Sequence, residues 1–136
     1  MQIQLRSIVN DQFRIAFQKL YKSPDIKAVA SFKLHALSKS LNDTNQHYED
    51  TRLKLCKQYA RKNEAGEAIL ITDPEKGTQR YEFDQKEGID FQRELHDLLQ
   101  EMVEVPEPTL KLADIAETSL SPEDIGTLVG IAFQAE

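Results

Sequence analysis

The sequence contains little cysteine, glycine or proline and has no long hydrophobic run, and each scarcity excludes a class of protein. The single cysteine, Cys56, excludes an intrachain disulfide, and five glycines and five prolines exclude a collagen-like or low-complexity chain. The longest apolar run, residues 125–133, is less than half of the about 20 residues that a membrane-spanning helix needs. The N-terminal segment lacks the basic flank and long apolar core of a signal peptide. We therefore expect a cytoplasmic globular protein without a membrane segment.

A chain of 136 residues is long enough for a single domain, and we expect one domain over residues 1–136. The net charge of −6 is distributed unevenly along the chain. Residues 1–62 contain 12 Lys and Arg against 5 Asp and Glu, a balance of +7. Residues 63–136 contain 5 against 18, a balance of −13. The two halves are electrostatic complements, so we expect them to pack together. We do not expect direct binding of nucleic acid, because few aromatic residues suited to base stacking accompany the basic ones.

One long amphipathic helix is predicted over residues of about 24–63. It begins at a serine followed by proline and aspartate, a common helix start, and runs without Pro or Gly to Asn63. Apolar and small residues recur along it at spacings of three and four: Leu34, Leu37, Leu41, Thr44, Tyr48, Thr51, Leu55 and Tyr59. At 1.5 Å per residue such a helix spans roughly 58 Å, so part of it must lie against another helix, another chain or water.

A second, acidic helix is predicted over residues of about 88–103 as the partner of the long helix. Its apolar stripe consists of Phe91, Leu95, Leu98, Leu99 and Met102. Between the two helices, the turn-forming "DPEKG" flanked by strand-like runs predicts a β-hairpin over residues of about 67–84. A shorter helix is predicted before the long one, from the near-helical spacing in "SIVNDQFRIAFQKLYK".

The two ends of the chain contain similar short segments. Residues 3–8 and 110–115 both alternate apolar residues, and we expect them to pair as short strands. The alternative is that each is an extended approach to a helix. A C-terminal helix over residues of about 122–134 is predicted from the "LSPED" start. The predicted fold is therefore α+β and mostly α, a long helical hairpin with a small β-hairpin at its tip and short paired terminal strands.

The order of these segments resembles a family of short, uncharacterised proteins of tailed bacteriophages and prophages. The most distinctive pieces are "KLCKQYARKNEAGE", "ELHDLLQEMVEV" and "LSPEDIGTL", and the resemblance covers nearly the whole chain. The chain departs from the pattern in the strand-rich insertion "ILITDPEKGTQRYEF", where we would expect a short polar loop. The resemblance implies a phage origin, with the protein in the cytoplasm of an infected bacterium or in the phage particle. It implies no reaction.

A catalytic or metal site is not expected. Asp43, His47 and Asp50 recur at helical spacing, but one helical face offers too few ligands for a metal ion. Cys56 lacks a positioned base, and a buried thiol is the simpler interpretation. The sequence contains no Gly-rich phosphate loop, no Gly-x-Ser-x-Gly elbow and no paired Cys motif. We therefore expect a protein that is not an enzyme and needs no cofactor.

The C-terminal apolar residues are the first candidate for partner binding. They cover more than one face of the predicted helix: Ile125, Leu128, Val129, Ile131 and Phe133. Either this helix is buried in its own domain, or it leaves a patch for a second copy or another phage protein. The corresponding functional hypothesis is a virion-associated or assembly protein, a component of the head, neck or tail.

An acidic row is the second candidate. Carboxylates recur every three or four residues between positions 84 and 107, and Asp90, Glu94, Asp97 and Glu101 form the centre of the row. This spacing permits a phosphate-like track, so the alternative hypothesis is an early phage regulator that inhibits a host enzyme by nucleic-acid mimicry. More commonly, such a row is solvated or paired with neighbouring lysines.

Overall fold

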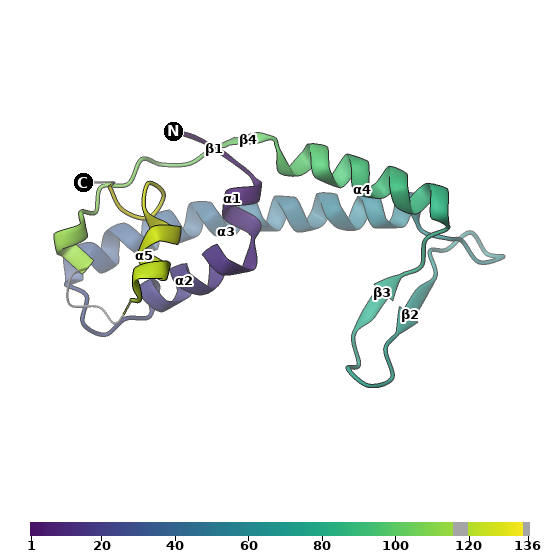
Figure 1. Cartoon of the computed structure of the whole chain (residues 1–136), viewed down its shortest axis with the longest axis horizontal. Helices are drawn as coiled ribbons and strands as arrows, with labels where there is room; N and C mark the ends of the chain where they lie inside the picture. The colour runs from purple at the N-terminus through teal and green to yellow at the C-terminus, as the bar shows by residue number, and fades with distance from the viewer. Residues whose placement is uncertain (116–119, 135–136) are drawn as a thin grey trace. The chain divides into compact units, whose positions relative to one another are not determined.

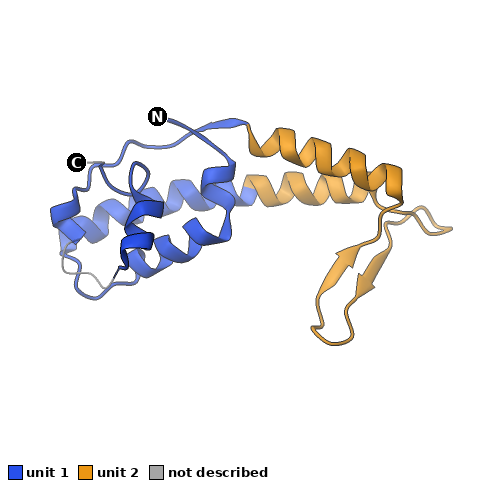
Figure 2. Cartoon of the chain, in the orientation of Figure 1, with its two compact units in different colours: residues 1–46, 101–136 blue, residues 47–100 orange. Residues whose placement is uncertain are grey.

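The computed structural model describes residues 1–115 and 120–134, and the chain divides into two compact units (Figure 2). Unit 1 consists of residues 1–46 and 101–136, and unit 2 of residues 47–100. The predicted single domain therefore comprises two units, and one long helix, α3 (Ala28–Tyr59), contributes to both. The predicted fold class is confirmed, since helices dominate and two small antiparallel sheets accompany them (Figure 1).

Unit 1 begins with β1 (Gln2–Gln4), α1 (Arg6–Val9) and α2 (Asp11–Tyr21), which confirms the short helix predicted before the long one. α2 begins after Asn10, whose side-chain oxygen accepts a hydrogen bond from the backbone N–H of Phe13 at 2.8 Å. The Asn10 amide also donates to the Arg6 carbonyl at 2.8 Å. One side chain thus ends α1 and begins α2. The buried face of α2 consists of Phe13, Ala16, Phe17 and Leu20.

The long helix α3 is shorter than predicted at both ends. Residues 24–26 form a turn instead of a first helical turn, because the chain must reverse direction there between α2 and α3. At the other end, the backbone N–H of Arg61 donates to the Glu82 carbonyl at 2.7 Å, and the Arg61 carbonyl accepts from Ile69 at 2.8 Å. These bonds to extended segments replace helical ones, so α3 ends at Tyr59 instead of near Asn63.

The predicted pairing of residues 3–8 with residues 110–115 is wrong. β1 pairs with β4 (Met102–Glu104) in an antiparallel ladder that sets Gln2 opposite Glu104. Residues 112–115 form a 3-10 helix, η1, because the Asp114 carboxylate accepts a hydrogen bond from the backbone of Lys111 at 2.8 Å and closes a turn. The acidic helix α4 (Gln85–Leu99) accordingly ends before residue 103, since the chain becomes extended at Met102 to form β4.

The C-terminal helix α5 (Pro122–Leu128) begins as predicted but ends six residues early. The Ser121 hydroxyl accepts from the Asp124 N–H at 3.1 Å, and the Asp124 carboxylate accepts from the Ser121 N–H at 3.2 Å, a complete capping box. Beyond the helix, Gly130 adopts a φ of +85° and donates to the Phe133 carbonyl at 2.9 Å. This turn sends Phe133 back into the core and prevents the helix from continuing to residue 134.

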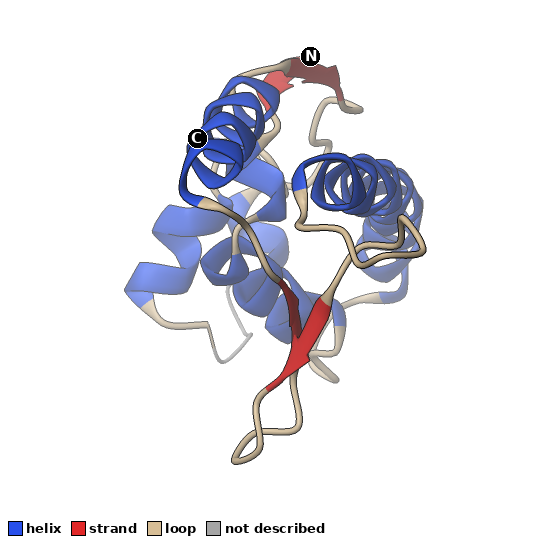
Figure 3. Ribbon diagram, turned by 90° about the vertical axis from the view of Figure 1, so that its right-hand side faces the viewer, coloured by secondary structure: helices blue, strands red, loops and turns tan. Residues whose placement is uncertain are grey.

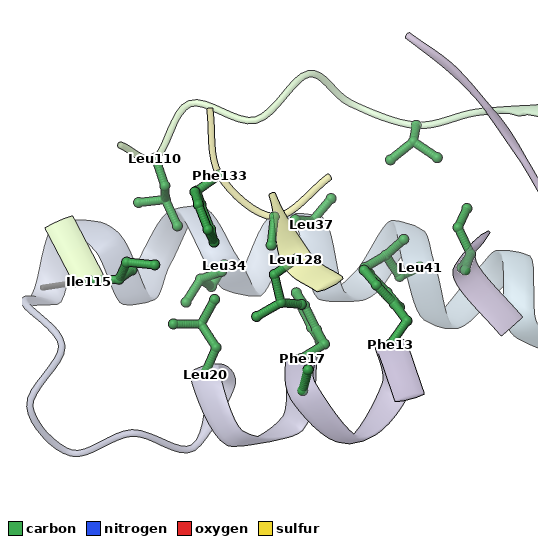
Figure 4. Close-up of a cluster of buried hydrophobic side chains, with 14 of the residues drawn as sticks. Phe13, Phe17, Leu20, Leu34, Leu37, Leu41, Leu110, Ile115, Leu128 and Phe133 are labelled. Carbon is green, nitrogen blue, oxygen red and sulfur yellow. The ribbon is translucent and has the colours of Figure 1, made fainter. Parts of the chain in front are cut away.

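The core of unit 1 lies between α2, α3, α5 and the segment after β4 (Figure 4). Leu34 and Leu37 of α3 point toward side chains from the other elements, among them Leu20 of α2 and Leu128 of α5. The Tyr21 hydroxyl lies 3.0 Å from Nδ1 of His35 and adds a polar link between α2 and α3. The labelled members of the cluster are Phe13, Phe17, Leu20, Leu34, Leu37, Leu41, Leu110, Ile115, Leu128 and Phe133.

Unit 2 contains the predicted helical hairpin and β-hairpin (Figures 1 and 3). β2 (Leu70–Thr72) and β3 (Gln79–Tyr81) pair in antiparallel register, and the hairpin leaves the helices where α3 ends and α4 begins. Its turn is closed by the Asp73 carboxylate, which accepts hydrogen bonds from the backbone of Glu75 and Lys76. Buried apolar residues of unit 2 are few: Cys56, Ala60 and Phe91.

Candidate protein-binding surfaces

The C-terminal residues that the sequence suggests for partner binding are mostly covered by unit 1 itself. Leu128 and Phe133 are buried, with exposed fractions of 0% and 1%, and Ile125 and Ile131 are half-buried against the same core. Val129 is the exposed member of the set. α5 also contacts α2 through polar groups, because Glu123 accepts a hydrogen bond from the Gln12 amide at 3.2 Å. The structure thus assigns Leu128 and Phe133 to the core.

The acidic row is divided among several elements. Asp90, Glu94 and Asp97 lie on α4, whereas Glu101 lies beyond the end of that helix, contrary to the predicted boundary. Glu94 accepts a hydrogen bond from the Tyr59 hydroxyl. Partial burial raises the pKa of Tyr59, and the carboxylates of Glu94 and Asp90 raise it further.

Two members of the acidic row, Asp84 at its start and Glu104 near its end, are engaged in ion pairs. The Asp84 carboxylate lies 3.6 Å from the guanidinium of Arg61, and the Glu104 carboxylate lies 3.0 Å from the amino group of Met1. The row that the sequence places on a single helix and its flanks therefore includes a helix cap, four residues of α4 and an extended segment. Its members on α4 are Glu87, Asp90, Glu94 and Asp97.

The residues with possible catalytic or metal-binding chemistry, Asp43, His47, Asp50 and Cys56, lie on α3. Asp43, His47 and Asp50 are exposed on α3, and within the described residues no group of three or more metal-ligating side chains is placed to hold an ion. The prediction that Cys56 is buried is confirmed, and burial raises the pKa of its thiol. Arg52 lies 3.8 Å from the Cys56 sulfur and opposes this shift only in part. A neutral, buried thiol is a poor nucleophile.

An exposed apolar surface lies on the N-terminal part of α3. Val29 and Phe32 are three residues apart on the helix, with exposed fractions of 69% and 77%. Phe32 also lines a recess of about 230 Å³. We call Val29, Phe32 and this recess the α3 apolar surface. The other apolar residues that line the recess are Leu34, Ala36, Leu37, Pro106, Pro108, Leu110 and Ala132.

A larger cavity of about 560 Å³ lies between α2 and α3, and we call it the α2–α3 groove. Phe13, Phe17 and Leu41 provide its apolar part, and each of them is at least nine-tenths buried. Ile15 contributes an apolar side chain that is 57% exposed. The remaining lining residues are polar or charged: Asp11, Arg14, Gln18, Lys19, Lys22, Asn42 and Asn45.

The sequence pattern did not identify either of these two surfaces. The only available signal was that Val29, Phe32 and Ile15 are large apolar residues out of phase with the buried stripes of their helices. Both surfaces combine apolar area with a polar border, which is the composition of protein-binding sites. In the described residues, no helix is both long and apolar enough to cross a membrane. Comparison with family models, with curated proteins and with solved structures finds no match to this chain.

Proposed function

We propose that this chain is a non-enzymatic phage protein that acts through protein–protein contacts as a virion-associated or assembly component of the head, neck or tail. The α3 apolar surface is the observation that carries the proposal. Phe32 and Val29 expose most of their side chains to water on one helical face. The phage origin rests on the resemblance of the sequence segments, and the partner is another phage protein or a second copy of this chain.

Exposure of the Val29 and Phe32 side chains to water is unfavourable, and their burial against a partner protein would stabilise the complex. Fully burying a Val or Phe side chain contributes about 1.5–3 kcal/mol relative to leaving it in water. The recess beside Phe32 offers further apolar contact from two prolines, Pro106 and Pro108. An apolar anchor beside a preformed recess is the arrangement found at the energetic centres of protein interfaces.

The test is quantitative mass spectrometry of purified particles of the phage or prophage that encodes the chain. We expect a fixed number of copies relative to the portal protein. A chain absent from particles but abundant early in infection would contradict the virion role and favour the inhibitor of a host enzyme.

A variant of the α3 apolar surface tests whether this surface is needed for incorporation into particles. Val29→Ser combined with Phe32→Ser removes exposed apolar area without opening the core, so the helical circular dichroism signal should be retained. We expect this variant to be lost from particles. Leu70→Ser is a matched control, because Leu70 is 48% exposed on the β-hairpin of unit 2. Normal incorporation of the double variant, or equal loss of the control, would count against the α3 apolar surface.

A further inference from the structure

We propose that the α2–α3 groove binds an amphipathic helix of a partner protein that carries carboxylates beside an apolar stripe. This inference rests on the proposed function in protein contacts and adds a second surface with a defined partner chemistry. It is carried by the shape, the apolar lining and the charge of the groove, which are independent of the α3 apolar surface.

The dimensions of the groove fit a helix. α2 and the residue that follows it contribute Asp11, Ile15, Gln18 and Lys22, whose spacings of four, three and four place them along one side of the helix. From Asp11 to Lys22 this side is about 16 Å long, or roughly three helical turns. The opposite wall consists of Leu41, Asn42 and Asn45 of α3. A helix that lies along α2 could insert a side-chain ridge here, and the α3 wall would contact about one turn of it, since Leu41 and Asn45 are four residues apart.

The apolar lining provides the anchor. Phe13, Phe17 and Leu41 are buried members of the unit 1 core, so the groove has a rigid hydrophobic base. Ile15 adds a separate apolar contact, because its side chain is 57% exposed and lies two residues from both Phe13 and Phe17, on another face of α2. Different side chains of the bound helix would therefore contact the base and Ile15.

The charge of the groove selects carboxylates. Arg14, Lys19 and Lys22 line the groove together with one acid, Asp11. Arg14 lies 3.6 Å from Asp11, and Lys19 lies 3.3 Å from Asp124, so the three cations and these two acids leave a positive excess of one, at Lys22. A basic helix would meet this excess with like charge, which is unfavourable.

The chain already contains a helix docked on α2 in this manner. The first turn of α5 contains Glu123 and Asp124, which contact Gln12 and Lys19 of α2 at 3.2 Å and 3.3 Å. Leu128 of the same helix is fully buried in the core beside α2. Carboxylates on polar residues of α2, together with a buried leucine, are therefore an observed mode of helix binding in unit 1. The groove offers the same chemistry at Lys22, the cation that directly follows the last residue of α2.

The experiment uses the full chain and fluorescence anisotropy with two labelled, stapled peptides about three helical turns long. The first carries leucines along one face and glutamates beside them, and the second carries lysines in place of the glutamates. We expect the acidic peptide to bind at least about tenfold more tightly, with a difference that decreases as salt is added. Equal affinity for both peptides, or no saturable binding of the acidic one, would overturn the proposal.

Substitutions at exposed positions locate the binding. Ile15→Ser and Lys22→Glu should each weaken binding of the acidic peptide by about tenfold, while the circular dichroism spectrum remains unchanged. Ile89→Ser and Lys39→Glu are the matched controls, because Ile89 is 54% exposed in unit 2 and Lys39 is exposed outside the groove. Equal weakening by the controls would contradict the assignment to the groove.

Two further outcomes separate the proposals. A single-stranded oligonucleotide that displaces the peptide as well as an unlabelled acidic peptide does would show a phosphate-binding groove and overturn the inference. A groove that fails to bind, in a chain that is still incorporated into particles through Val29 and Phe32, would remove this inference and leave the proposed function intact.

Discussion

The ammonium group of Lys19 lies 3.3 Å from a carboxylate oxygen of Asp124, and the two residues are 105 positions apart in the sequence. The same carboxylate closes the capping box of α5 by accepting from the Ser121 N–H. One side chain therefore begins α5 and attaches it to α2. Because this carboxylate must be charged for both roles, the junction between α2 and α5 depends on pH.

We predict that protonation of Asp124 destabilises unit 1. The backbone hydrogen bond from Ser121, helped by Lys19, holds the pKa of Asp124 below its ordinary value of 3.8. Between these two pKa values the unfolded chain binds more protons, so stability rises with pH in that window and is lost as acid is added. Asp124→Asn should reduce the fall in unfolding free energy between about pH 5 and about pH 3, measured by urea denaturation.

Asp43→Asn is the control for this measurement, because Asp43 is exposed on α3 and takes no part in the capping box. An unchanged pH slope in Asp124→Asn would show that the junction does not contribute to acid sensitivity.

A pair of substitutions on α3 tests the core of unit 1. Leu34 is 1% exposed and Phe32, two residues earlier, is 77% exposed. Leu34→Ala should lower the free energy of unfolding by about 2–5 kcal/mol through lost burial and a cavity. Phe32→Ala should change it by no more than about 0.5 kcal/mol. The denaturant midpoints of the two variants show which of the two side chains belongs to the core. Similar midpoints would mean that α3 presents a different face to the core.

Two glycines near the C-terminus should respond oppositely to alanine. Gly126 lies within α5 with open space around an added Cβ, so Gly126→Ala should stabilise the chain by about 0.5–1 kcal/mol. Gly130 has a φ of +85°, a left-handed conformation that costs an L-residue about 1–2 kcal/mol. Gly130→Ala should therefore lower the melting temperature that Gly126→Ala raises. Stabilisation by both would indicate that α5 continues past Leu128.

Cys56 should be almost inert toward thiol reagents in the folded chain. Its side chain is 3% exposed, and burial raises the pKa of the thiol, so little thiolate forms at mildly basic pH. Reaction with Ellman's reagent should be many-fold slower for the folded protein than for the protein in urea. Leu53→Cys in a Cys56→Ser background is the exposed control, because Leu53 is 37% exposed on the same helix. Equally fast reaction at both positions would contradict the burial of Cys56.

Elements with local signals were predictable from the sequence. The Ser121 cap, the stripe of α2 and the turn at Asp73 each depend on residues within a few positions, and each is present in the structure. The end of α5 was missed because the left-handed conformation of Gly130 is decided by the burial of Phe133. The sequence around Gly130 does not indicate that Phe133 is buried in the core.

The partner of β1 was missed for a related reason. Met102 fits the apolar stripe of the acidic helix predicted over residues of about 88–103, so the pattern did not indicate a strand at residues 102–104. The segment that was predicted to pair, residues 110–115, is instead closed into a short turn at Asp114. The two candidate binding surfaces were also beyond sequence analysis, because the α2–α3 groove exists only where two helices contribute side chains to one cavity. The exposure of Phe32 likewise depends on how the other elements pack around α3, which the sequence pattern of α3 alone does not indicate.

The discontinuity of unit 1 determines when it can fold during synthesis. Its core combines Phe13 and Leu34 with Val105, Leu128 and Phe133, so more than half of the chain is translated between the first contributors and the last. Unit 2 is one continuous segment, residues 47–100, and all of it leaves the ribosome before Val105 does. Long-range closure of this kind is slow and leaves apolar surface exposed meanwhile. On a translating ribosome, Phe13 and Phe17 of α2 therefore lack their core partners Leu128 and Phe133 until the last residues of the described chain are made.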